Sequence, residues 1–215
     1  MDVKDAIAGT IAGSRDRLTG LSHQLHAHPE TAWHEERAAA WVSAELADAG
    51  FDVQTGACEL PTAFIARAGT GPLHIGICAE YDALPGVGHA CGHNIIAASS
   101  VGAGLALAAV ADDLGLTVTV LGTPAEEGGG GKVYMLERGA FDGIHAAMMV
   151  HPWPEEWLDP RGQTRSKAGK WLGGCKTQHN DVNCGAPFVS ESTSYNVAAK
   201  LWGAGKTKLA WRGQG

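Results

Sequence analysis

The 215-residue sequence has no long apolar run, few cysteines and, in its first 160 residues, few basic side chains. No stretch approaches the roughly 18 consecutive apolar residues of a membrane-spanning helix, which disfavours an integral membrane protein. The first 19 residues are mixed and charged, without the apolar segment of a secretory leader. Five scattered cysteines, an odd number, disfavour a disulfide framework. These absences predict a soluble, cytoplasmic protein.

The charge is divided unevenly along the chain. Residues 1–160 hold 7 Lys/Arg against 21 Asp/Glu, a net charge of −14, whereas residues 161–215 hold 9 against 2, a net charge of +7. A basic segment can bind nucleic acid or a membrane surface. Here the basic residues are spaced singly among Gly, Thr, Asn and Trp, without a cluster or a helical stripe. We therefore expect neither a nucleic-acid nor a membrane partner.

Helical and strand patterns alternate over the first 160 residues, and apolar residues make up 45% of the chain, enough for a core. Such alternation is typical of an α/β fold, here a mostly parallel-type sheet covered by helices. The glycines in the helix expected at 94–112 allow this helix to pack closely on the sheet. The expected helices are 3–28, 35–49, 94–112 and 132–138, and the expected strands are 51–54, 63–68, 73–80, 116–122 and 146–150.

The pattern changes after Pro160. Residues 161–215 show no sustained helical or strand period, and only 195–202 are expected to form a short helix. We therefore predict a folded unit over 1–160 and an atypical basic tail over 161–215. One hypothesis is that a frameshift or early termination produced this tail. If neither other reading frame of the DNA after codon 160 continues a related sequence, that hypothesis is wrong.

Cys91 and His93 follow an apolar strand and precede a helix, with a glycine between them. Polar groups at the carboxyl end of a strand are the usual active site of an α/β fold. Thiolate and imidazole are good ligands for zinc and acceptable ones for other first-row metals. For this pair alone, a buried cysteine beside a structural histidine is the favoured explanation.

Two further strand ends strengthen the metal interpretation. Glu126 and Glu127 follow the strand 116–122, and His151 follows the strand 146–150. Adjacent carboxylates repel each other unless a cation lies nearby, although a helix N-terminus also favours acidic residues. One carboxylate can bind the metal while its neighbour takes a proton from water. Three such strand ends in one chain predict a metal site.

The combination of these motifs resembles family twenty of the metallopeptidases, and within it auxin-conjugate hydrolases, aminobenzoyl-glutamate hydrolase and related dipeptidases. The resemblance covers roughly residues 15–160. The strings that carry it are His26-Ala27-His28-Pro29-Glu30 with Glu35, Glu80-Tyr81-Asp82-Ala83-Leu84-Pro85, Gly88-His89-Ala90-Cys91-Gly92-His93-Asn94, Glu126-Glu127-Gly128 and His151-Pro152.

The resemblance implies a two-metal catalytic domain that cleaves amide bonds of small N-acyl amino acids or dipeptides. By position, the implied ligands of two divalent ions, Zn²⁺ or Mn²⁺, are Cys91, His93, Glu127 and His151. Glu126 matches the general base, and Asp82 matches an aspartate that orients a metal ligand. His26, His28 and His89 are expected to form structural hydrogen bonds instead.

The sequence also departs from this family. Relatives are nearly twice as long, with a lid domain that supplies substrate and dimer contacts and a resumed segment that brings one more His ligand. Neither is recognisable after Pro160, and the surroundings of His179 do not match that motif. Three hypotheses follow: a working amidohydrolase, a truncated and inactive remnant, or a small metal-binding or interaction protein. A cysteine-nucleophile hydrolase is disfavoured because Cys91 and His93 are too close in sequence.

A nucleotide-binding loop is also disfavoured. Gly128–Gly131 followed by Lys132 suggests one, but the first glycine is misplaced and Val133 occupies the Ser/Thr position. A loop near the substrate fits these residues better.

Overall fold

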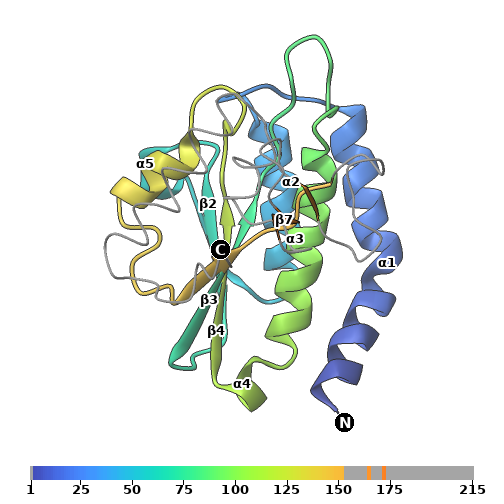
Figure 1. The fold of residues 1–215 in the computed structure, drawn as a ribbon, viewed down its shortest axis with the longest axis vertical. Coiled ribbons are helices and arrows are strands. Elements are labelled where there is room, and N and C mark those ends of the chain that lie inside the picture. Colours follow the sequence, from blue (N-terminus) through green and yellow to red (C-terminus); the bar gives the residue numbers. More distant parts are fainter. Residues whose placement is uncertain (1, 153–163, 166–170, 173–215) are drawn as a thin grey trace.

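A five-stranded sheet with helices on both faces forms the centre of the computed structural model, which describes residues 2–152, 164–165 and 171–172 (Figure 1). The helices are α1 (Val3–Ala27), α2 (Glu36–Ala47), α3 (His93–Ala108), α4 (Ala111–Leu114) and α5 (Gly131–Glu137), with a 3-10 turn η1 (Ala57–Glu59). The strands are β1 (Asp52–Thr55), β2 (Phe64–Ala68), β3 (Leu73–Ala79), β4 (Leu116–Gly122) and β5 (Ala146–Met148), and a separate pair, β6 (Thr164–Arg165) and β7 (Trp171–Leu172).

The sheet is mixed, with the strand order β1-β2-β4-β3-β5. Strands β4, β3 and β5 are parallel, in line with the mostly parallel-type sheet expected from the sequence. Strand β2 runs antiparallel to both β1 and β4. The predicted α/β architecture is confirmed. Strands β1 and β2 are antiparallel because the segment that joins them is too short for a parallel crossover.

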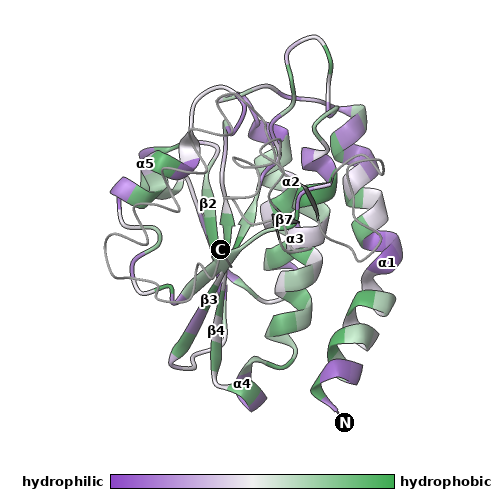
Figure 2. Cartoon of the chain, viewed as in Figure 1, coloured by the Kyte–Doolittle hydropathy of each residue, from purple (hydrophilic) through white to green (hydrophobic). Residues whose placement is uncertain are grey.

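Helix α3 packs closely on the sheet because two small residues face its neighbours. A Cβ atom at Gly104 would lie 2.7 Å from Val120 of β4, and one at Gly102 would lie 2.8 Å from Leu18 of α1. Strand β4 is buried along its whole length. Apolar residues therefore concentrate on β4 and α3, whereas apolar and polar residues alternate along α1 (Figure 2). The close packing predicted for this helix is confirmed.

Helix α1 packs against α3, and only part of its apolar residues is buried. Leu21 and Leu25 lie in the core, whereas Ile11 is 40% exposed. In the part of the chain that the structure describes, no helix is both long enough and apolar enough to cross a membrane.

Most of the predicted tail lies outside the described residues, including the helix expected at 195–202 and His179. The boundary predicted at residue 160 therefore stays a prediction. Within the described part, Cys58 and Cys91 carry free thiols.

Candidate metal centre

The carboxyl ends of the three parallel strands reach the same edge of the sheet. Ala79 at the end of β3 pairs with Gly122 at the end of β4, and Ile77 of β3 pairs with Met148 of β5. Thr123 continues this alignment, because its backbone N–H donates to the carbonyl of Ala79 at 2.8 Å. The segments that follow these strands carry every residue predicted for the site, so the register itself brings them together.

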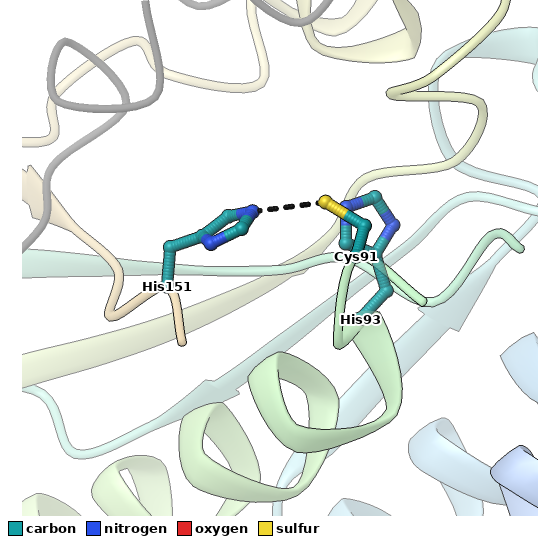
Figure 3. A group of neighbouring side chains, drawn as sticks. All are labelled: Cys91, His93 and His151. Carbon is teal, nitrogen blue, oxygen red and sulfur yellow. Dashed lines mark hydrogen bonds between the residues drawn. The ribbon is translucent and has the colours of Figure 1, made fainter. Parts of the chain in front are cut away.

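Cys91 and His93 project from the start of α3 toward the loop after β5 (Figure 3). Gly92 between them has a φ of 86°, and a Cβ atom there would lie 2.4 Å from the ring of Pro152. Only glycine suits both the conformation and the space. The tight turn places Sγ of Cys91 3.2 Å from Nε2 of His151. Nδ1 of His151 donates to the carbonyl of Pro152 at 2.7 Å, so the lone pair of Nε2 faces the thiol.

His93 is fully buried and surrounded by carboxyl groups. Its Nδ1 lies 3.0 Å from Oδ1 of Asp82, whose other oxygen accepts the backbone N–H of Glu127 at 2.9 Å. Its Nε2 has no hydrogen-bond partner among the described residues. Carboxylate oxygens of Glu80, Glu127 and Glu126 lie 3.3, 3.6 and 3.8 Å from that atom. This contact requires a proton or a cation between the nitrogen and the oxygens, because lone pairs would otherwise face each other.

The pKa values of the metal-free site reflect this crowding. Burial lowers the pKa of His93, but the attraction of Asp82 and their hydrogen bond outweigh it, so this pKa lies well above its ordinary value. Burial raises the pKa of Asp82, but the charge of His93 and the hydrogen bond between them outweigh it and place this pKa below its ordinary value. Burial also raises the pKa of the Cys91 thiol. Without metal, His93 thus holds a proton among these carboxylates, and a bound cation would take the place of that proton.

Two groups of side chains have donor atoms close enough to share a metal ion, and both include His93. Cys91, His93 and His151 form one group and Glu80, His93 and Glu126 the other, with donor atoms within 4.8 Å of one another in each. A thiol, two imidazoles and several carboxylates are the donors that divalent first-row metals prefer. The residues present therefore fit divalent ions.

The predicted site residues come together, with one difference in their arrangement. Glu126, predicted as the general base, belongs to a group at ligand distance. Glu127, predicted as a ligand, belongs to neither group of three, although its Oε1 lies 3.6 Å from Nε2 of His93, and 15% of its side chain is exposed. The assignment of one glutamate as base and the other as ligand stays a prediction.

Sequence reasoning missed Glu80 and Lys132 as parts of this site. Both are completely buried, and the Lys132 ammonium forms an ion pair with the Glu80 carboxylate. Glu80 stands directly after the apolar strand β3, which was a usable signal. Lys132 had no comparable signal, because a lysine at the start of a helix is normally exposed.

The three histidines expected to be structural belong to neither group. Nδ1 of His28 lies 2.9 Å from the carbonyl of Gln24 on α1, and its ring contacts Trp41 edge to face. His26 lies exposed near the end of α1, and His89 is buried beside the site.

His89 makes the stability of the protein depend on pH. Burial, followed by repulsion from His93 and His26, lowers its pKa from 6.5 to about 4. The folded protein thus keeps His89 neutral where the unfolded chain binds a proton. This contribution to stability is fully present above pH 6.5 and is lost as the pH falls toward 4.

We expect the urea midpoint of the metal-free protein to decrease when the pH is lowered from about 7.5 to about 5.0. The decrease should be smaller in His89→Gln. His23→Gln, which changes an exposed histidine on α1, is the control and should behave like the unmodified protein. Equal falls for the His89 variant and the control would contradict this assignment.

Comparison with known proteins gives consistent matches. Residues 76–206 match the family described as peptidase family M20/M25/M40, a match that continues past residue 160. An Xaa-Arg dipeptidase of Mus musculus is 40% identical over 168 residues, covering 71% of this chain and 39% of the relative. A p-aminobenzoyl-glutamate hydrolase polypeptide of Escherichia coli (strain K12) is 35% identical over 165 residues, covering 68% and 34%.

A solved structure agrees with these sequence matches. The Bacillus subtilis YXEP protein, described as a dinuclear metal binding peptidase from the M20 family, superposes with a TM-score of 0.61 at 28% identity. The match covers 67% of this chain and 45% of that one. Against the curated relatives above, the chain spans between one third and two fifths of their length.

Proposed function

The chain belongs to peptidase family M20/M25/M40. We propose that it forms part of a metal-dependent hydrolase that cleaves amide bonds in dipeptides or small N-acyl amino acids. The observation that carries this proposal is the position of His93, whose Nε2 faces three carboxyl groups while Cys91 and His151 lie beside it. Such a cluster of acidic groups in a buried site is costly without cations.

Each residue then has a distinct role. Cys91, His93, Glu127 and His151 would hold two divalent ions, Zn²⁺ or Mn²⁺. Bound divalent ions supply Lewis-acid polarisation and ease the deprotonation of water. Glu126 would take a proton from the attacking water and deliver it to the departing amine. Asp82 keeps His93 in the tautomer whose Nε2 faces the site, because its carboxylate accepts from Nδ1.

The names of the relatives suggest which substrates to test. An Xaa-Arg dipeptide and p-aminobenzoyl-glutamate are the two primary candidates, because the relatives named for them are 40% and 35% identical to this chain. We also propose a cytoplasmic location, since a thiol such as Cys91 stays reduced most readily in a reducing compartment.

The test combines metal content with activity. We expect the purified protein, stripped with a chelator and titrated with Zn²⁺ or Mn²⁺, to bind up to two ions per chain by mass spectrometry. Hydrolysis of the two substrates should disappear on chelation and return with metal. Metal binding without hydrolysis would favour a metal-binding protein, and the absence of both would remove the proposal.

Replacement of a donor should weaken binding strongly. Partners that only orient a ligand contribute about 10–100-fold to metal affinity, so Cys91→Ser or His151→Ala should lose on the order of 100-fold or more. Cys58→Ser, which changes a thiol on η1 outside both donor groups, is the matched control. Equal affinities for Cys91→Ser and Cys58→Ser would show that the thiol at the site is not a ligand.

A further inference from the structure

Glu35 is a buried carboxyl group that contacts the loop carrying Glu126 and Glu127. It precedes α2 but makes no side-chain hydrogen bond to that helix. Its Oε1 accepts the backbone N–H of Ala125 at 2.7 Å, and its Oε2 accepts the hydroxyl of Thr62 at 3.0 Å. It is fully buried, and burial, with a smaller contribution from nearby Asp82, raises its pKa. Burial of a carboxyl group costs free energy of folding, so we expect Glu35 to have a role beyond stabilising the fold.

The partner of Glu35 is itself in an unfavourable conformation. Ala125 has a φ of 54°, in the left-handed region that residues with a Cβ atom avoid. Its carbonyl accepts the N–H groups of Gly129 at 2.9 Å and Gly130 at 2.7 Å. The turn at Ala125 is therefore held through both its N–H and its carbonyl. The direction of the following residues, Glu126 and Glu127, depends directly on this backbone conformation.

Residues 30–35 also contact the rest of the site. The carbonyl of Glu30 accepts the backbone N–H of Ala83 at 2.8 Å, one residue after Asp82. The ring of Trp33 lies against Gly129, where a Cβ atom would come within 2.2 Å of it. The segment before α2 therefore supports two of the loops that surround His93, although it follows none of the parallel strands.

We propose that Glu35 is a positioning residue that holds Ala125 in the left-handed conformation and thereby fixes Glu126 and Glu127 against His93. The catalytic meaning of this role rests on the proposed function. Its geometric part concerns only the loop and can be measured without metal or substrate.

The first measurement follows the loop itself. We expect Glu35→Ala to accelerate backbone hydrogen exchange of residues 125–130 by at least about tenfold in the metal-free protein, because the N–H of Ala125 loses its acceptor. Glu36→Gln, which changes an exposed neighbour on α2, should exchange like the unmodified protein. Unchanged exchange in Glu35→Ala would overturn the proposal, whatever the enzyme does.

The second measurement separates positioning from simple stability. Zn²⁺ titration against a competing chelator should show a loss of affinity of about 10–100-fold in folded Glu35→Ala. Glu35→Gln should lose less, since its amide oxygen can still accept from Ala125 and its NH₂ can donate to the hydroxyl of Thr62. The loss should also shrink when Glu35→Ala is made in an Ala125→Gly background, because glycine adopts positive φ without penalty.

These outcomes distinguish the two proposals. A lower urea midpoint in Glu35→Ala, with unchanged Zn²⁺ affinity and no effect of Ala125→Gly, would reduce Glu35 to a structural role and overturn the inference. If the unmodified protein binds no Zn²⁺, the proposed function fails. The exchange experiment then still decides whether Glu35 holds the loop.

Discussion

Replacing Glu126 with Gln is expected to lower the rate of amide hydrolysis by about 10²–10⁴-fold, the usual contribution of a positioned general base. Glutamine has nearly the same shape but cannot take a proton from water. The measurement is the turnover of an Xaa-Arg dipeptide by the metal-loaded protein, with metal content determined on the same sample.

Glu127→Gln is the matched comparison, because it changes the adjacent carboxylate. If Glu127 binds metal, this variant should lose affinity, and excess Zn²⁺ or Mn²⁺ should restore part of its activity. Excess metal should not restore Glu126→Gln. The opposite result, with rescue of Glu126→Gln alone, would exchange the roles of the two residues. The comparison is informative because Glu126, not Glu127, belongs to a donor group of three.

The second large effect is expected on stability, from the buried ion pair between Lys132 and Glu80. Lys132→Met removes the ammonium and leaves the buried Glu80 carboxylate without its lysine partner, and breaking a buried ion pair in this way typically costs about 3–5 kcal/mol. We expect a loss of at least about 3 kcal/mol in the free energy of unfolding, measured by urea denaturation of the metal-free protein.

A paired substitution provides the control. Glu80→Gln combined with Lys132→Met removes both charges and should recover much of this loss, because an uncharged pair avoids the buried unpaired charge. If the double variant is as unstable as Lys132→Met alone, the loss came from packing rather than from charge.

The sequence predicted the elements and the meeting of strand ends well. Strand β4 matches its expected range of 116–122, since a β-branched apolar run is a strong signal for a central strand. The expected helix 94–112 divides into α3 and α4 around residues 109–110. The order of the strands was beyond reach, because pairing depends on contacts between distant segments.

The interior partners of the site were also beyond sequence reasoning. Lys132 and Glu80 are 52 residues apart, and Glu35 and Ala125 are 90 apart, so no local pattern connects them. Glu35 was noticed only as part of an N-terminal motif. Cys91 and His93 were easier to find, because a two-residue spacing across a glycine is visible in the chain itself.

The distance in sequence between the donors has a thermodynamic consequence. Cys91 and His151 meet at 3.2 Å although 60 residues separate them, so a denatured chain holds no preformed set of ligands. An ion that binds across these loops therefore selects the native state over the denatured one. At a free concentration about 100 times its dissociation constant, such an ion adds about 2.7 kcal/mol to folding. Cellular metal supply would then govern how much of the protein survives folded, in addition to how much of it is active.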